Sequence, residues 1–229
     1  MESCACPLCG AAADPVGRAL HRTHCACPRC DLRFIPSSFH LTPEQEYQRY
    51  LLHQNSLSDA GYVAFLTVAV ELLKTHLKRA DGGSPTLLDY GSGPNPVLVQ
   101  LLNRSGFTAV GYDPFFGDRV TPGVEVTASL RGLGPFDAVV STEAMEHFRD
   151  PRREWAQMVS LIRPGGLLVV VTSLVLPGRE VSSWHYATDP THVVFYSEST
   201  FRYISEQWGL TRVATNGRNA VVLRTPVQA

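Results

Sequence analysis

The strongest constraint on the fold is the segment LLDYGSGPNP at residues 87–96, which joins an apolar run to a helix start. Gly91 and Gly93 carry no Cβ, so the backbone there can turn tightly and a ligand can approach it closely. Asn95 and Pro96 are typical of a helix start, where free N–H groups point outward. In an open parallel sheet such a turn lies at the carboxyl edge, where ligands bind. The segment therefore predicts a strand, a ligand-binding turn and a helix.

An acidic residue follows this turn at an informative spacing. Asp113 ends the next apolar run about twenty residues after Gly91, where a carboxylate can accept hydrogen bonds from both hydroxyls of a ribose. A dinucleotide-binding turn would have a third glycine where Pro96 stands, and no G-K-S/T sequence marks a phosphate-binding loop. The turn and the acid together favour a nucleoside cofactor of another kind.

After Pro85 short apolar strands alternate with helical segments. We expect strands at 86–89, 109–112, 124–127, 136–141 and 167–172, and helices at 96–104 and 151–161. The alternation predicts an α/β fold with a Rossmann-like, doubly wound, mostly parallel sheet. Asn216-Gly217 separates two further apolar runs, at 210–214 and 220–224, and indicates an antiparallel C-terminal hairpin. Before Pro85, a helix is expected at 42–52, where Thr42 can cap it and Pro43 suits its first turn. A second is expected at 58–78, where apolar side chains recur at helical spacing.

The turn, D-x-G-x-G from Asp89 to Gly93, resembles the first motif of class I S-adenosylmethionine-dependent methyltransferases. FDAVVSTEAMEHF at 136–148 and RPGGLL at 163–168 resemble that family's fourth-strand motif and its turn into the fifth strand. The resemblance implies a methyltransferase (EC 2.1.1 class) that binds S-adenosylmethionine. Asp89, Gly91, Ser92 and Gly93 would hold its methionine end and Asp113 its ribose. Thr142 and Glu143 would face the methyl group. Asn95 stands where the family usually has glycine, and its side chain tolerates positive φ better than most.

All six cysteines fall within the first 30 residues. Cys6-x-x-Cys9 and Cys27-x-x-Cys30 form two knuckles of the kind that complete a tetrahedron around zinc. A closed four-sulfur site has no open position, so we expect a structural Zn²⁺ in a small N-terminal zinc ribbon. Cys4, Cys25, His21 and His24 offer alternative ligands, and metal-free buried cysteines are the remaining alternative.

We predict a zinc-ribbon module at 1–36, a helical linker or lid at 37–84 and a methyltransferase domain at 85–229.

Methyl transfer to a hydroxyl or amine needs a group that takes the acceptor's proton. His192, His185 and His147 are candidates, since a neutral imidazole suits proton transfer near pH 7. His185 and His192 lie in a polar and aromatic stretch at 184–196, which resembles a segment of a bacterial group of small, ribbon-bearing methyltransferases. For each histidine a structural role is an equal alternative. The polar segment 53–56 offers further side chains, for which a solvated helix start is an equal alternative.

The formal net charge of −1 gives no general attraction to nucleic acid or to anionic membranes. No apolar run is long enough to cross a bilayer and no signal peptide is visible, so a cytoplasmic location is expected. The leading hypothesis is methyl transfer to a small-molecule acceptor. One alternative is an RNA methyltransferase that grips RNA through four arginines of the ribbon, Arg18, Arg22, Arg29 and Arg33. Another is a non-catalytic partner protein that binds the cofactor; the sequence leaves the acceptor and the oligomeric state open.

Overall fold

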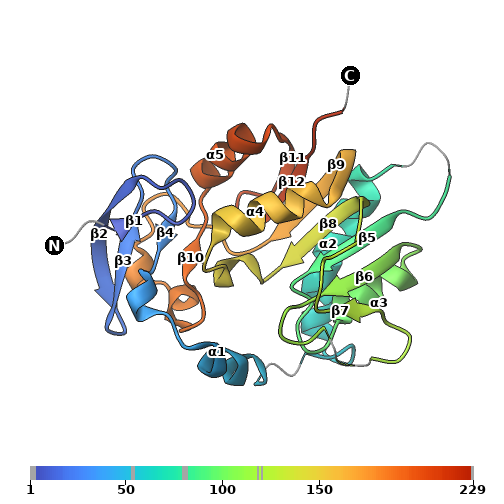
Figure 1. Ribbon diagram of the computed structural model, residues 1–229, viewed down its shortest axis with the longest axis horizontal. Coiled ribbons are helices and arrows are strands. Elements are labelled where there is room, and N and C mark those ends of the chain that lie inside the picture. Colours follow the sequence, from blue (N-terminus) through green and yellow to red (C-terminus); the bar gives the residue numbers. More distant parts are fainter. Residues whose placement is uncertain (1–3, 53–54, 79–81, 118, 120, 228–229) are drawn as a thin grey trace.

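Two β-sheets organise the described part of the chain, as the computed structural model in Figure 1 shows. The structure describes residues 4–52, 55–78, 82–117, 119 and 121–227. The larger sheet has seven strands in the order β11-β12-β9-β8-β5-β6-β7. These strands are β5 (Thr86–Tyr90), β6 (Thr108–Tyr112), β7 (Val126–Thr127), β8 (Phe136–Thr142), β9 (Ile162–Val171), β11 (Thr211–Thr215) and β12 (Ala220–Arg224).

The predicted Rossmann-like α/β fold is confirmed in this sheet. Its strands from β9 to β7 are parallel, while β12 and β11 add antiparallel pairs at one edge. The first strand of the domain, β5, pairs with β6 on one side and β8 on the other. The chain therefore changes direction across the sheet between β5 and β8. Crevices that bind ligands form at the carboxyl ends of strands at such a point.

Helices cover both faces of the sheet, because its buried strands carry apolar side chains on both sides. α2 (Ala60–His76) and α3 (Val97–Arg104) cover one face, where Leu73 joins the cluster that includes Leu87. α4 (Pro151–Ser160) and α5 (Glu198–Trp208) cover the other, where Trp155 and Phe201 join the cluster that includes Leu88. The alternation of Leu87 and Leu88 between the two clusters follows from the period of two along a strand.

The remaining helical elements border the carboxyl edge or the smaller sheet. α1 (Pro43–Tyr50) starts as predicted at Thr42, whose hydroxyl accepts from Gln45 N while the Gln45 side chain accepts from Thr42 N. Four short 3₁₀ segments occur in the described residues: η1 (Ser37–Phe39), η2 (Met145–His147), η3 (Val181–Ser183) and η4 (His185–Thr188). Nowhere in the described ranges is a helix both long and apolar enough for a membrane crossing.

The smaller sheet has the strand order β1-β2-β3-β4-β10. β1 (Cys4–Ala5), β2 (Ala12–Ala19), β3 (Arg22–Ala26) and β4 (Arg33–Phe34) come from the N-terminal region, and β10 (Val194–Phe195) comes from far along the chain. Figure 1 shows these blue strands beside the orange β10. The domain limits 1–36, 37–84 and 85–229 stay predictions, although the pairing of β10 with β4 joins the first segment to the third.

Several local expectations differ in detail from the structure. α3 begins at Val97, one residue later than expected, and no side chain caps it. Asn95 is not among the residues with positive φ, so the turn does not use the tolerance that its side chain provides. The hairpin between β11 and β12 is antiparallel as predicted, but its loop runs from Asn216 to Asn219. Asn216 Oδ1 accepts three backbone N–H groups across that loop, which explains the longer connection.

Candidate functional site

The glycine turn after β5 folds against the end of β6. The N–H groups of Gly91 and Ser92 both donate to Tyr112 O, at 2.8 and 3.0 Å. Gly91 has φ 88°, and a Cβ placed on it would lie 2.5 Å from the Cβ of Ala144. Gly93 has φ 69° and no atom within 4 Å of such a Cβ. Gly91 is therefore required by close packing, whereas Gly93 presents open backbone at the edge where a ligand is expected.

Asp113 fixes this turn at the end of β6. One carboxylate oxygen accepts from Gly93 N at 2.9 Å, and the other accepts from Phe115 N and Phe116 N at 2.9 and 3.1 Å. Burial raises the pKa of Asp113, and these N–H groups oppose the shift. A carboxylate has about four lone-pair directions, so three are occupied and about one is left for a further donor. The expected ribose contact stays a prediction, with room for one strong hydrogen bond in this arrangement.

Asp89 lies beside Asp113, almost fully buried at the end of β5. Burial, and then the charge of Asp113, raises the pKa of Asp89 to about 7. The charge of Asp89 also raises the pKa of Tyr62 on α2, after burial as the larger cause, so α2 reaches this edge. The side-chain amide of Asn55 donates to Tyr62 Oη at 3.1 Å. Of the expected segment 53–56, His53 and Gln54 lie outside the described residues.

Thr142 is the last residue of β8, and Glu143 follows it directly. Glu143 has φ 48°, and its N–H donates to Val171 O at 2.8 Å. Burial, and then the charge of Glu146, raises the pKa of Glu143 to about 9. Among the described residues, the buried Thr142 Oγ1 has no hydrogen-bond partner, and neither has Ser92 Oγ in the glycine turn. Buried hydroxyls without partners call for an explanation, and a ligand at this edge provides one.

A second polar group forms beside this edge, and the sequence did not single out its central member. Glu146 in η2 is fully buried and accepts from Tyr186 Oη at 2.6 Å and from Thr172 Oγ1 at 2.9 Å. His147 and His192 meet next to it, with ring centroids 4.7 Å apart. Burial lowers the pKa of His192. His185, the third predicted histidine, is exposed on η4 and is not part of this group.

Helix α1 covers the histidine group from the side. The ring of Tyr50 contacts His147 edge to face, with centroids 5.2 Å apart. Tyr50 Oη donates to Glu46 Oε1 at 2.7 Å, and the nearly buried Glu46 pairs with Arg149. At the end of the helix, Arg49 pairs with Asp189 at 3.0 Å. These contacts connect α1 to both segments that carry the histidines.

The four predicted zinc ligands lie together in the N-terminal sheet. Cys6 Sγ is 3.6 Å from Cys30 Sγ, Cys9 Sγ is 3.3 Å from Cys27 Sγ, and all four sulfurs lie within 4.8 Å of one another. Zinc bound to four thiolates at about 2.3 Å would place the sulfurs about 3.8 Å apart, so the group has the right size. Cys4 and Cys25 do not belong to it.

The two knuckles have the same backbone turn. Cys6 O accepts from Gly10 N at 2.9 Å, and Cys27 O accepts from Asp31 N at 2.9 Å. The residue after each second cysteine has positive φ, 74° at Gly10 and 58° at Asp31. The matching turns aim both cysteine pairs inward, which is the arrangement that a tetrahedral metal requires.

A buried arginine of the N-terminal sheet holds the segment that carries His192. The guanidinium of Arg22 donates to four backbone carbonyls, those of Ala187, Asp189, Pro190 and His192, at 2.7 to 3.2 Å. Next to it, Ile35 N donates to Val193 O at 2.8 Å. Arg22 was one of four arginines considered for RNA, and its contacts are all internal. A second, Arg33, pairs with Asp31 at 3.1 Å.

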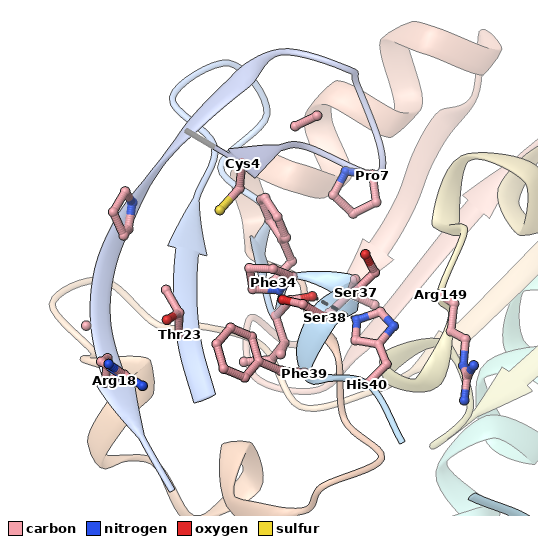
Figure 2. Close-up of a pocket in the computed structure, with 16 residues that line it drawn as sticks. Cys4, Pro7, Arg18, Thr23, Phe34, Ser37, Ser38, Phe39, His40 and Arg149 are labelled. Carbon is pink, nitrogen blue, oxygen red and sulfur yellow. Dashed lines mark hydrogen bonds between the residues drawn. The ribbon is translucent and has the colours of Figure 1, made fainter. Parts of the chain in front are cut away.

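Neither of two surface cavities lies at the carboxyl edge. The larger, about 980 Å³, is lined by the N-terminal sheet, η1 and Arg149. Figure 2 shows Arg18, Phe34, Phe39 and His40 around it. The smaller, about 490 Å³, lies between α2 and the C-terminal hairpin. The candidate site is therefore defined by its residues and not by either cavity.

Comparison with known proteins agrees with this fold. The family model described as "Methyltransferase domain" matches residues 50–215. An uncharacterized methyltransferase of Mycobacterium tuberculosis (strain ATCC 25618 / H37Rv) is 34% identical over 115 residues, covering 45% of this chain and 57% of that protein. A ubiquinone biosynthesis O-methyltransferase of Caulobacter sp. (strain K31) is 34% identical over 101 residues, covering 38% of this chain and 40% of that protein. The matches thus span about half the length of these curated relatives.

A solved structure shows the same fold over nearly the whole chain. It is the 1,6-didemethyltoxoflavin-N1-methyltransferase of Burkholderia thailandensis, with bound 1,6-didemethyltoxoflavin and S-adenosylhomocysteine. The TM-score is 0.56 at 17% sequence identity, and the match covers 93% of this chain and 100% of that one. Because the family model covers more than half of the sequence and the sheet has the matching topology, this chain belongs to the methyltransferase domain family.

Proposed function

We propose that this protein transfers a methyl group from S-adenosylmethionine to a small-molecule acceptor. The observation that carries the proposal is the junction of β5, β6 and β8 at the carboxyl edge. There Gly93 presents open backbone between two buried acids, Asp89 and Asp113. A zwitterionic amino-acid end and a ribose have the charges and hydroxyls that such a junction can bind.

The residues of this edge fit the cofactor in several respects. Asp89, once ionised, would bind the ammonium group of the methionine end, and Asp113 would accept from a ribose hydroxyl. Thr142 Oγ1 and Ser92 Oγ, which are buried without partners in the described residues, would gain hydrogen bonds. When bound, the cofactor supplies a methyl group on a sulfonium sulfur, and this carbon is the electrophile. Thr142 and Glu143, at the end of β8, would border it.

The acceptor side is formed by the histidine group and α1. Transfer forms a bond between the acceptor atom and the methyl carbon, breaks the carbon–sulfur bond, and releases the acceptor's proton. His192 and His147 would receive that proton on Nε2, because Nδ1 of each ring contacts a backbone carbonyl. His185 is less well suited because it is exposed. The aromatic ring of Tyr50 would exclude water beside His147.

We also propose that Cys6, Cys9, Cys27 and Cys30 hold a structural Zn²⁺. The sulfur distances and the two matching turns support this assignment. The ion would stabilise a small sheet that has little core of its own. Through Arg22 the sheet would in turn position the segment with His192, which gives the module a role in shaping the acceptor site.

The RNA alternative loses one of its four arginines, since Arg22 is buried against backbone carbonyls, whereas Arg18 and Arg29 are exposed. The decisive experiment uses methyl-labelled S-adenosylmethionine with fractionated bacterial metabolites, and separately with bulk RNA, followed by mass identification of the product. We expect a labelled small molecule. Label in RNA would favour the alternative, and cofactor binding without any transfer would favour a non-catalytic partner. A cytoplasmic location remains part of the proposal.

A further inference from the structure

Glu146, His147 and His192 place one carboxylate and two imidazoles around a common point. One ligand-type atom from each residue lies within 4.8 Å of the other two. Glu146 and His147 come from η2, just after β8, whereas His192 comes from the segment that Arg22 holds. Two separate parts of the chain are therefore brought together with the residue types that bind transition metals.

Backbone carbonyls determine which nitrogen of each imidazole carries the hydrogen. His147 Nδ1 lies 3.1 Å from Thr191 O, and His192 Nδ1 lies 2.7 Å from Tyr186 O. A carbonyl oxygen can only accept, so Nδ1 carries the hydrogen in both rings. In a neutral ring Nε2 then has a lone pair and no hydrogen. Metal-bound histidines usually make this contact, donating their other N–H to a carbonyl or carboxylate.

The carboxylate is oriented in a comparable way. Tyr186 Oη donates to Glu146 Oε1 and Thr172 Oγ1 donates to Oε2, so each oxygen receives a hydrogen bond from the protein side. Each oxygen keeps a further lone pair. Two imidazole lone pairs and a carboxylate that lie together in a partly buried group favour a cation between them.

We propose that Glu146, His147 and His192 bind a divalent transition-metal cation. Two histidines and one glutamate form the protein ligands of several catalytic zinc sites, and two histidines with a carboxylate bind ferrous iron in others. Such a site keeps open positions, and an acceptor hydroxyl would bind there as its anion. Its proton would then pass to water and not to His147 or His192, because a ring nitrogen that binds the cation cannot also take up a proton. This role deepens the proposed function and depends on it, whereas cation binding itself does not. The acceptor class implied is a hydroxyl compound, methylated on oxygen.

Cobalt titration tests the site directly. Protein that already holds one zinc per chain in the cysteine site is titrated with Co²⁺, followed by calorimetry and visible absorption. We expect one equivalent to bind, with the weak visible bands of nitrogen and oxygen ligands and without the intense near-ultraviolet bands of thiolate ligands. Absence of Co²⁺ binding, or thiolate bands alone, would overturn the proposal.

Variants connect the binding to the three residues. Glu146→Gln, His147→Gln and His192→Gln should each weaken Co²⁺ binding at least tenfold, whereas His185→Gln, on the exposed 3₁₀ segment, should leave it unchanged. Equal binding by all four variants would refute the site. Far-ultraviolet circular dichroism, measured on the same samples, reports whether each variant is folded. S-Adenosylhomocysteine binding separates the two proposals: retained nucleoside binding with no Co²⁺ uptake refutes only the cation site, and the reverse refutes only the cofactor assignment.

Discussion

Replacing Arg22 by Ala should destabilise the protein strongly, because this one side chain connects the N-terminal sheet to the segment 187–192. Its guanidinium donates at 2.7, 2.9, 3.0 and 3.2 Å to four carbonyl oxygens. The residue is 7% exposed, so in the variant water cannot freely replace every lost contact. The carbonyls belong to one continuous stretch, which would lose its common donor at once.

The expected magnitude follows from these contacts. A hydrogen bond from a charged donor contributes about 1.5–3 kcal/mol, but four such bonds to one segment are not additive because the segment can relax. We therefore expect the free energy of unfolding to fall by about 3–5 kcal/mol, near the upper end for a single substitution. Arg22→Lys should recover only part of the loss, since one ammonium cannot span four carbonyls.

Urea denaturation followed by circular dichroism measures this change. Arg18→Ala is the matched control, because Arg18 lies on the neighbouring strand, is exposed, and makes one contact to His21 O at 3.3 Å. The control should change the free energy of unfolding by less than about 0.5 kcal/mol. Amide hydrogen exchange should also become faster at 187–193 in the Arg22 variant. An Arg22→Ala protein as stable as the control would show that Arg22 does not hold the segment 187–192.

Three further predictions concern the cofactor edge and the zinc site. Asp89 has a pKa of about 7 in the free protein and must be ionised to bind an ammonium group. The affinity for S-adenosylhomocysteine should therefore fall as the pH drops below 7, by up to about tenfold per pH unit. Calorimetry from pH 5.5 to about 8.5 tests this, and an affinity that does not change with pH would show that Asp89 does not make the contact. Gly91→Ala should lower the free energy of unfolding by about 1–3 kcal/mol more than Gly123→Ala does. Both glycines have positive φ, but only at Gly91 would a Cβ lie 2.5 Å from Ala144 Cβ. Equal losses of stability on thermal unfolding would contradict this account of the packing. Cys27→Ser should lower both the zinc retained after dialysis and the thermal stability, and unchanged zinc content would disprove the four-thiolate site.

Much of the proposed cofactor edge is predictable because its determinants are local. The spacing of Gly91, Gly93 and Asp113 along two consecutive strands fixes which ends meet in a parallel sheet, and the structure brings them together. The cysteine pairs are similar, since each C-x-x-C turn is set by a few neighbouring residues. The predicted strand 124–127 is longer than β7, which has only residues 126 and 127. Val124 instead forms an isolated bridge with Thr121.

The proposed acceptor side depends on contacts between distant segments, which a local pattern cannot specify. Glu146 stands in the fourth-strand motif, but nothing near it in sequence indicates that His192 would lie beside it. The arrangement E-x-x-E-H at 143–147, two acids followed by a histidine, was the one available signal. The buried role of Arg22 was likewise hidden, since an arginine in a short polar strand is most often exposed.

The central claim is that the turn between β5 and α3, with Asp113 at the end of β6, binds the nucleoside of S-adenosylmethionine. Calorimetric titration of the zinc-loaded protein with S-adenosylhomocysteine tests it most directly. We expect one molecule bound per chain, and a loss of about 1–3 kcal/mol in binding free energy for Asp113→Ala, as for a lost charged acceptor. Absence of binding by the unaltered protein, or equal affinity in the variant, would contradict the account.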